Sequence, residues 1–427
     1  MDDLFPRLIS CAGLFVMVLL GWALGKHRNQ INWRIVGGGL LAQLVLAIFV
    51  MRTEEGNTLF TAIGGVFAGM LDFVDQGSEM VFGPNYTDFY FAFKVLPTII
   101  FFSSLMAVLY YLNVIQPLVR FLAWTMRVTF RTSGAETLAV AANIFVGQTE
   151  APLVVKPYVP SMTRSELMAL MVGGFATISG GILAAYIGMG IDATHLVSAS
   201  VISAPAALVI AKLMQPETEV PLTLGQGVII QKTDDDPVNV VDAAARGAGD
   251  GLALALNVGA MLIAFLALLA GVDWFVGFLG DICERLVNMV GNGPPVDYQW
   301  SLASIMGWVF APLAWLMGIQ WAECGIAGEL LGYKLFANEF IAYQNLVERQ
   351  AELSPRTTVI LTYALCGFAN FGSIGIQLAG IGGIAPTRRS DLAKLAVRAM
   401  LGGTLAAFMT ACFAGMLYGV PWDVIKW

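Results

Sequence analysis

The chain has 427 residues, of which 57% are hydrophobic and only 12% are charged, and its mean hydropathy is +0.74. This composition excludes a soluble domain and indicates a polytopic membrane protein of the all-α class. The net charge of −7 excludes the basic surface that nucleic acids require, so we expect no nucleic-acid partner. The five cysteines form no CxxC pair, so neither a metal cluster nor a disulfide framework is implied.

Apolar runs of about 20 residues predict eight membrane-spanning helices. They cover residues 5–25, 33–52, 88–112, 164–190, 195–214, 250–276, 356–380 and 394–419. Asp2 and Asp3 precede the first run and a basic cluster at 26–34 follows it. This order argues against a cleavable signal and, by the positive-inside rule, predicts an N-terminus outside the cell. An even number of crossings then returns the C-terminus to the outside as well.

Four further segments do not fit a simple crossing. Residues 59–76 and 113–131 carry apolar side chains on one face and charged ones on the other, which predicts helices lying in the membrane interface. Residues 134–157 and 302–345 are apolar but interrupted by Gly, Gln, Asn, Glu and Pro, which predicts two re-entrant hairpins. Irregular backbone at membrane depth is tolerated only where protein or water covers it.

The chain also repeats itself weakly. Residues 174–177 and 367–370 each begin a glycine-broken stretch inside a predicted span, and each follows a polar loop with one glutamate, Glu150 or Glu339. The crossing count starts the first copy from the cytoplasm and the second from outside, so the repeats are inverted. Inverted repeats with broken helices are typical of secondary transporters, whose substrate site lies near the membrane midplane.

At these residues the chain resembles the concentrative nucleoside transporter family. The resemblance lies in the motifs GQTEAP at 147–152, ANEF at 337–340 and CGFAN at 366–370, followed by Ser373. The order of spans, interfacial helices and hairpins agrees over nearly the whole chain. The resemblance implies a sodium-coupled nucleoside symporter of the bacterial type, placed in the inner membrane as a homotrimer. It also implies transport domains that move as elevators.

The same resemblance divides the chain into four parts. Residues 1–131 would hold scaffold spans 1–3 with the interfacial helices, and residues 132–215 the first transport repeat, with hairpin 1 and spans 4 and 5. A cytoplasmic loop, an interfacial helix and scaffold span 6 would occupy residues 216–300. The second transport repeat, with hairpin 2 and spans 7 and 8, would fill residues 301–427.

A cation site is expected where the first hairpin meets the first broken helix. Broken helices expose carbonyl groups, and carbonyls with amide or hydroxyl side chains suit a hard cation that prefers oxygen. Asn143 and Thr177 supply such side chains, and the backbone carbonyls of Val146, Thr177 and Ile178 complete a small cage. The resemblance places sodium, as the coupling ion, at these positions. In the alternative interpretation, Asn143 and Thr177 only cap broken helix ends.

The first polar loop has the chemistry of a nucleobase site. Gln148 and Glu150 offer donors and an acceptor, which complement a base edge that shows both a carbonyl and an N–H, and Thr149 reaches in through its hydroxyl. No arginine falls in either polar loop, so a phosphate or carboxylate substrate would lack its usual partner.

The second polar loop and its broken helix suit a ribose. Glu339, Asn370 and Ser373 provide acceptors and donors for vicinal hydroxyls. Phe368 offers a ring face, and Ile182, just past the first broken stretch, offers an apolar wall. A nucleoside therefore fits the two loops together.

Three alternatives remain open on the sequence alone. The glutamates and Gln148 can instead join helices to one another, and protons can replace sodium as the coupling ion. A membrane-embedded enzyme with Glu150 and Glu339 as acid and base is a third, less favoured possibility, because the chain lacks HExxH and GxSxG motifs. No nucleotide-binding loop is present, so we expect neither a primary pump nor an enzyme.

Overall fold

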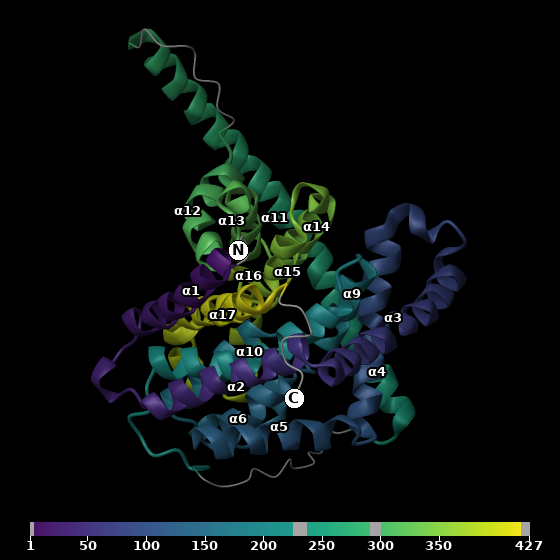
Figure 1. Ribbon diagram of the computed structural model, residues 1–427. Helices are drawn as coiled ribbons and strands as arrows, with labels where there is room; N and C mark the ends of the chain where they lie inside the picture. Colours follow the sequence, from purple (N-terminus) through teal and green to yellow (C-terminus); the bar gives the residue numbers. More distant parts are fainter. Residues whose placement is uncertain (1–3, 225–236, 291–299, 420–427) are drawn as a thin grey trace.

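The computed structural model describes residues 4–224, 237–290 and 300–419, and in these ranges it is built of helices without a β-strand (Figure 1). The first half contains α1 Leu4–Ala23, α2 Trp33–Arg52, α3 Glu54–Phe82, a π-helical turn at Phe91–Val95, α4 Leu96–Tyr111, α5 Ile115–Phe130, α6 Gly134–Ala142, α7 Ala151–Val154, α8 Arg164–Ala176, α9 Gly180–Gly188 and α10 Ala193–Met214. The second half contains α11 Val240–Val290, α12 Leu302–Leu316, α13 Cys324–Phe336, α14 Glu339–Glu348, α15 Pro355–Leu365, α16 Phe371–Ile384 and α17 Arg389–Leu417.

Eight segments of the described chain are long and apolar enough to cross a membrane. They are Leu4–Ala23, Trp33–Arg52, Glu54–Phe82, Phe91–Tyr111, Arg164–Gly188, Ala193–Met214, Val240–Leu286 and Pro386–Leu417. Seven of them coincide with predicted spans, which confirms a multi-pass helical membrane protein. The predicted span 356–380 is instead divided between α15 and α16. The helix α3, which contains the predicted interfacial segment 59–76, meets the length criterion for a span, so its interfacial position stays a prediction.

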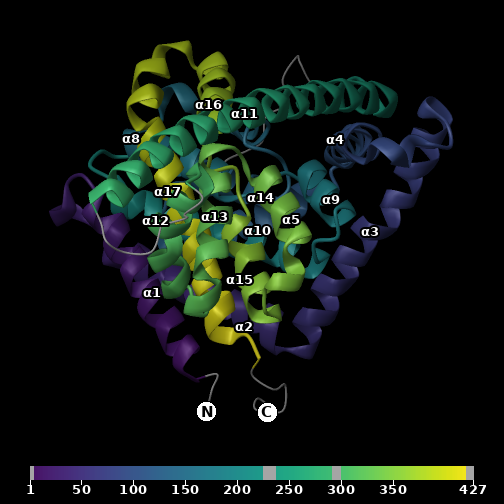
Figure 2. The same ribbon diagram turned by 90° about the horizontal axis from the view of Figure 1, so that it is seen from above.

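The helix α11 is much longer than the sequence indicates. We expected an interfacial helix followed by a span at 250–276, whereas the structure joins both in one helix of 51 residues. At 1.5 Å per residue its length is about 76 Å, more than twice the roughly 30 Å hydrocarbon core of a bilayer. It packs along α4, where a Cβ added to Gly251 would lie 2.8 Å from the Cα of Ile100. Figure 2 shows α11 as a long rod crossing the molecule beside α4.

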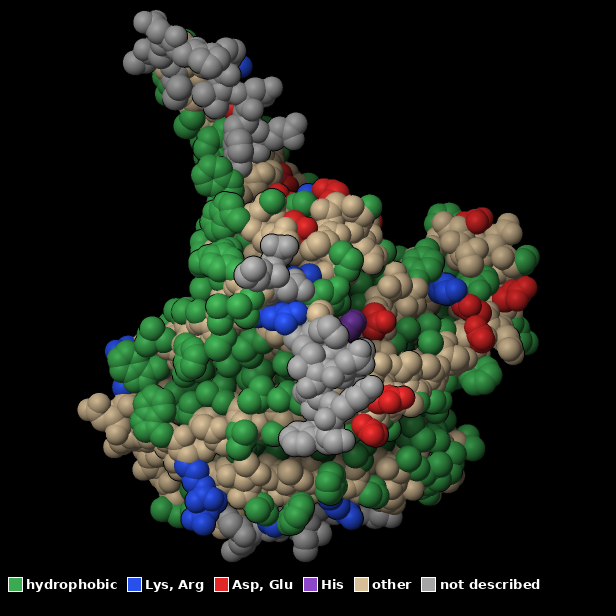
Figure 3. Space-filling model, in the orientation of Figure 1, with side chains coloured by type: hydrophobic (Ala, Val, Ile, Leu, Met, Phe, Trp, Pro, Cys, Tyr) green, Lys and Arg blue, Asp and Glu red, His purple; other side chains and the backbone are tan. Residues whose placement is uncertain are grey.

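The second predicted interfacial segment, 113–131, forms the amphipathic helix α5. Its buried face repeats every three to four residues, at Ile115, Val119, Ala123, Met126 and Phe130. Aromatic side chains of the opposite face are exposed. In Figure 1 α5 lies across the lower end of the molecule, and in Figure 3 Lys and Arg side chains gather along that edge. This distribution matches the basic flank that the positive-inside rule predicts for a cytoplasmic side.

The two halves of the core follow one order of elements. In the first, α6 and α7 form a hairpin with its tip at 143–150, α8 and α9 form a broken helix, and α10 is continuous. In the second, α13 and α14 form a hairpin with its tip at 337–338, α15 and α16 form the broken helix, and α17 is continuous. The segment 302–345, expected to be a single hairpin, therefore contains three helices. Of these, α12 precedes the repeat and packs along α13.

Three largely buried helices of the described chain, α8, α10 and α17, pack against one another. The two broken helices meet at their breaks. Gly367 has a positive φ of 119°, and a Cβ there would come 2.7 Å from the carbonyl oxygen of Phe175 and 3.0 Å from that of Ala176. A side chain at 367 would thus be strained by its backbone conformation and blocked by the other break. This crossing places polar side chains from both repeats at one depth.

Candidate functional site

Glu339 connects the two repeats at the first residue of α14. Its side chain is 6% exposed and accepts hydrogen bonds from the Tyr186 hydroxyl of α9 and from Nδ2 of Asn370, each at 2.9 Å. A carboxylate carries about four lone-pair sites, so these two bonds leave acceptor capacity for a ligand. The predicted pair of Glu339 and Asn370 is therefore in direct contact.

Asn370 has two functions in the structure. It is the N-cap of α16, since its Oδ1 accepts from the backbone N–H of Ser373 at 2.8 Å. Its Nδ2 donates to Glu339. Ser373, Asn370 and Glu339 thus form one buried chain of hydrogen-bonded groups, and their recognition of ribose hydroxyls stays a prediction.

Gln148, in the tip of the first hairpin, is tied to α16 by two side chains. Its Nε2 lies 3.3 Å from Ser373 Oγ, and its Oε1 accepts from Gln377 Nε2 at 3.1 Å. Gln377 Nε2 also donates to the Met171 carbonyl oxygen at 3.1 Å. Gly174 makes this arrangement possible, because a Cβ there would lie 2.7 Å from Gln377 Nε2. The amides thus join α8, α16 and the hairpin tip.

Glu150 differs from Glu339 in its surroundings. It is exposed, at the N-terminal end of the short helix α7, and its carboxylate lies beside Gly147. Thr149 supplies a side-chain hydrogen bond to it, and the Thr149 methyl lies against α16, 3.5 Å from where a Cβ on Gly380 would sit. The carboxylate is therefore accessible to a ligand.

The two apolar candidates are both buried. Ile182 lies in the first turn of α9, and Phe368 lies in the break between α15 and α16. The structure places them in the two broken helices as the sequence predicts. Their contact with a substrate stays a prediction.

The cation candidates lie at the carbonyl ends of two helices. Asn143 is the C-cap of α6 and Thr177 is the C-cap of α8. A Cβ added to Gly173 of α8 would lie 3.4 Å from Asn143 Nδ2, so the two ends are adjacent. Asn143 is 1% exposed, and its Oδ1 is without a hydrogen-bond partner in the described ranges. Thr177 Oγ1 donates to the Gly173 carbonyl oxygen at 2.9 Å.

A buried amide oxygen without a donor is costly and calls for an explanation. Here it lies at two helix C-termini, each of which carries a partial negative charge. Neutral oxygens of this kind, with the carbonyls of Val146, Thr177 and Ile178, suit sodium. Among the described residues no group of three His, Cys, Asp or Glu side chains could hold a metal.

Sequence reasoning missed three buried polar residues of this region. They are Tyr186, Lys334 and Gln377. A signal for Gln377 exists, because it follows Ser373 by four residues and Asn370 by seven, which puts all three on one helix face. A comparable signal for Lys334 is its position five residues before Glu339 in an apolar stretch.

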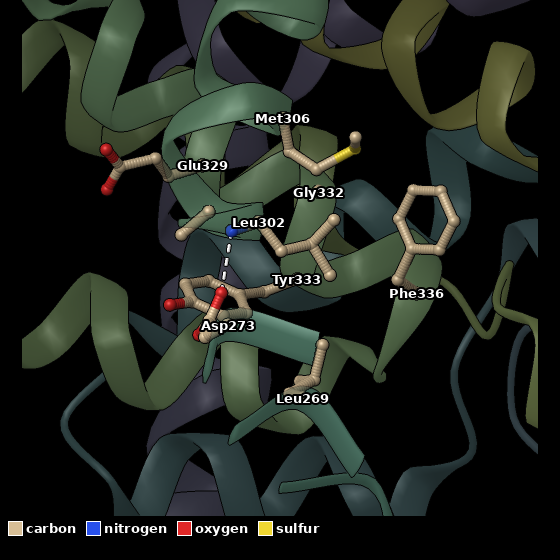
Figure 4. Close-up of a pocket in the computed structure, with 9 residues that line it drawn as sticks. Leu269, Asp273, Leu302, Met306, Glu329, Gly332, Tyr333 and Phe336 are labelled. Atoms are coloured by element: carbon tan, nitrogen blue, oxygen red, sulfur yellow. Dashed lines mark hydrogen bonds between the residues drawn. The ribbon is translucent and has the colours of Figure 1, made fainter. Parts of the chain in front are cut away.

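A small pocket lies elsewhere, between α11, α12 and α13 (Figure 4). Asp273 of α11 accepts from the Leu302 N–H at 2.6 Å, and Met306 and Phe336 close the apolar side. The cavity volume is about 10 Å³, enough for a single water molecule. None of the candidate site residues lines this cavity. We therefore interpret it as a small gap in the packing and not as a substrate site.

The comparisons with known proteins agree with this geometry. Three family models match successive parts of the chain: "Na+ dependent nucleoside transporter N-terminus" at 12–85, "Nucleoside recognition" at 92–193 and "Na+ dependent nucleoside transporter C-terminus" at 195–415. The chain is 43% identical to rat solute carrier family 28 member 3 over 97% of its length, and 43% identical to mouse sodium/nucleoside cotransporter 1 over 96%. It spans 59% and 64% of the length of these two curated relatives.

Solved structures of a shorter relative cover the chain more completely. An inward-facing, substrate-bound state of CNTnw is 39% identical, with a TM-score of 0.87, and the match covers 96% of this chain and 99% of that one. An outward-facing state of a CNTnw variant gives a TM-score of 0.89 at 39% identity, covering 97% and 99% of the two chains.

Proposed function

Since the chain belongs to the Na+ dependent nucleoside transporter family, we propose that it is a secondary active symporter that imports nucleosides such as uridine with sodium. The observation that carries the proposal is the meeting of two polar clusters at the crossing of the broken helices. Glu339 and Asn370 form one cluster, and Gln148 with Ser373 joins it to the first hairpin. Solute carriers with broken helices bind their substrates at such crossings.

The nucleobase binds at the tip of the first hairpin in this proposal. Gln148 presents an amide donor and acceptor, Glu150 an accessible carboxylate, and Thr149 a hydroxyl that orients that carboxylate. Binding exchanges the protein hydrogen bonds of Gln148 for bonds to the base edge, so their number is conserved. A site that hydrogen-bonds its ligand in this way discriminates strongly against analogues that lack the groups.

The ribose binds at the second hairpin and second broken helix. Glu339 accepts from ribose hydroxyls with the lone pairs that Tyr186 and Asn370 leave open, and Ser373 adds a donor. Phe368 and Ile182 cover the apolar faces of the nucleoside. Because Glu339 is buried, its charge-assisted bonds are stronger than those of an exposed carboxylate.

Sodium binds at Asn143 and Thr177, with the carbonyls of Val146, Thr177 and Ile178. The tip of the first hairpin is fixed to α9 through Gly180, whose N–H donates to the Phe145 carbonyl oxygen at 3.0 Å. An ion at Asn143 thus holds the backbone that carries Gln148 and Glu150. Sodium and nucleoside then stabilise one conformation of the same segment, which is a coupling free energy between the two sites.

The assembly follows from the family in the same proposal. The chain forms a homotrimer in a bacterial inner membrane, with both termini outside, and each transport domain moves as an elevator. The closely packed pair of α4 and α11 belongs to the scaffold, and the two hairpins with their broken helices belong to the transport domain. The partners are thus a nucleoside, a sodium ion, the lipid membrane and two copies of the same chain.

The alternatives differ in their support. The relatives of the chain are named as cotransporters, which argues against a membrane enzyme that uses Glu150 and Glu339. Proton coupling stays a second candidate, because water can satisfy Asn143 where no sodium binds. The sodium interpretation is favoured by the Asn143 oxygen, which accepts no hydrogen bond in the described structure and lies at the carbonyl ends of two helices.

Uptake of radiolabelled uridine into proteoliposomes tests the proposal. We expect accumulation above equilibrium under an inward sodium gradient, and only equilibration when sodium is equal on both sides. An inward proton gradient with choline in place of sodium separates the two coupling ions. Protein-free liposomes give the leak. Uptake that never exceeds equilibrium under either gradient would refute the symporter.

A further inference from the structure

Lys334 in α13 is a buried cation that the proposed substrate and sodium sites do not use. It is 1% exposed, and its ammonium donates to the carbonyl oxygens of Ala364 at 2.8 Å and Cys366 at 3.3 Å. Both carbonyls lie at the C-terminal end of α15, where the half-helix stops. The last carbonyls of a helix have no intrahelical donor and together carry about half a negative elementary charge. Lys334 therefore neutralises the end of this half-helix.

The corresponding place in the first repeat has no such side chain. By the common order of elements, α6 corresponds to α13 and α8 to α15. The C-terminal end of α8 faces the neutral Asn143, whose Oδ1 lacks a partner within the described ranges. Thr177 directs its hydroxyl back to Gly173. One carbonyl end thus carries a fixed ammonium, and its counterpart carries an unsatisfied oxygen.

The glutamates of the two hairpins, Glu339 and Glu150, also differ in their charged neighbours. Glu339 interacts electrostatically with Lys334, whose ammonium donates its hydrogen bonds to the Ala364 and Cys366 carbonyl oxygens. The interactions resolved for Glu150 are with Thr149, with the backbone at Gly147 and with a further acid, Asp250 of α11. None of these interactions of Glu150 is with a base.

We propose that Lys334 is a built-in cation which holds, in the second repeat, the place that a transported sodium ion takes in the first. It thereby limits the protein to one coupling ion per nucleoside. This inference rests on the proposed function and deepens it, since it names the determinant of ion number. Lys334 acts as a positioning residue, because it keeps the end of α15 and Glu339 in place without an ion from solution.

Replacement of the ammonium creates the missing site. Lys334→Met keeps the length of the side chain but leaves the Ala364 and Cys366 carbonyls and Glu339 without a positive partner. The two carbonyl oxygens freed at this half-helix end are ligands of the kind that sodium prefers. Lys334→Arg keeps the charge and should keep the ion number.

Sodium binding to the purified full chain in detergent tests the inference directly. Labelled sodium at equilibrium should give one ion per chain for the wild type and for Lys334→Arg, and two for Lys334→Met. Lys94→Met is the matched control, because it also removes an ammonium, but from a side-chain ion pair with Asp75 at 3.0 Å and not from a half-helix end. One ion per chain in Lys334→Met would overturn the inference, since water would then have replaced the ammonium.

Thermal unfolding covers the case in which Lys334→Met folds poorly. A ligand that binds only the folded state raises the unfolding midpoint with its concentration. The rise per decade of sodium should be about twice as steep for the variant as for the wild type, with choline chloride holding the ionic strength constant. The inference is contradicted if choline raises the unfolding midpoint of Lys334→Met as much as sodium does. It is also contradicted if the variant is unfolded at every sodium concentration. Wild type that binds one sodium but accumulates no nucleoside overturns the proposed function alone.

Discussion

The Tyr186 hydroxyl of α9 donates a 2.9 Å hydrogen bond to Oε1 of Glu339, although 153 residues separate the two in the chain. The tyrosine belongs to the first repeat and the glutamate to the second. A second contact joins the same two helices, because the ring centroid of Tyr186 lies 4.6 Å from that of Tyr343, one turn after Glu339 in α14. The ribose site in our proposal is thus shared by both repeats, and its geometry depends on how they are docked.

Glu339→Gln should weaken ribonucleoside binding while the fold is kept. Charge-assisted hydrogen bonds contribute about 1.5–3 kcal/mol, which corresponds to a loss of roughly 10- to 150-fold in uridine affinity. The loss should depend on the sugar, because a deoxynucleoside lacking the contacted hydroxyl already forgoes the bond. Calorimetry with uridine and its deoxy analogues, on wild type and variant, measures this coupling. Equal losses for all ligands would assign Glu339 a purely structural role.

Gly174→Ala should disturb the amide bridge between Gln148 and Gln377. The added methyl would lie 2.7 Å from Gln377 Nε2 and 3.0 Å from Gln148 Cβ, so both amides must shift. Losing one net hydrogen bond of about 1 kcal/mol lowers uridine affinity about 5-fold, measured by equilibrium binding. Gly375→Ala is the matched control in α16, since nothing lies within 4 Å of its added Cβ. Unchanged affinity in Gly174→Ala would show that the bridge does not position the base site.

The motifs predicted much of this site because they follow helix breaks. Gly367 and the polar residues after it indicate a break in an apolar span, and in the structure Asn370 at this break is hydrogen-bonded to Glu339. The sequence does not indicate how the two repeats pack against each other. Tyr186 reads as an ordinary apolar-helix residue until α9 is placed against α14.

Hydropathy alone was enough to predict most of the membrane-spanning helices. It did not predict where one helix ends and the next begins. The single helix α11 was expected as two elements, because the polar residues near 242–250 resemble an interfacial segment. They lie instead on a helix that continues beyond any bilayer, so polarity there marks no break. Similarly, α12 reads as part of the second hairpin because its apolar run leads into α13 through only a short turn.

Asn143→Ala should raise the sodium concentration needed for half-maximal uptake. The side chain offers an amide oxygen that no donor satisfies in the described structure, and removing it deletes one proposed sodium ligand. Saturating sodium should recover most of the uptake rate, and uridine affinity measured at that sodium level should be nearly unchanged. Asn345→Ala, which removes a half-buried amide that donates to the Ile341 carbonyl oxygen within α14, is the control. A parallel rise in both variants would remove Asn143 from the ion site.

Lys212→Met should destabilise the first repeat strongly. Lys212 is 4% exposed and forms a 2.5 Å salt bridge with Glu136, which is 1% exposed, and its ammonium also donates to Ser165 Oγ at 2.8 Å. Removing one partner of a buried pair leaves an uncompensated charge and costs about 3–5 kcal/mol of the free energy of unfolding. Lys94→Met provides the contrast, because its pair with Asp75 is partly exposed and such pairs contribute about 1 kcal/mol or less.

The double variant Lys212→Met with Glu136→Gln separates charge from packing. It removes both ions, so stability should recover by at least half of the loss in Lys212→Met, measured by thermal unfolding in detergent at fixed sodium. Glu136 also accepts from the Ser133 N–H at 2.8 Å in the cap of α6, and glutamine preserves that bond through its carbonyl oxygen. Full additivity of the two single changes would show that the ions do not interact, and would leave the first hairpin held to α10 by apolar packing instead.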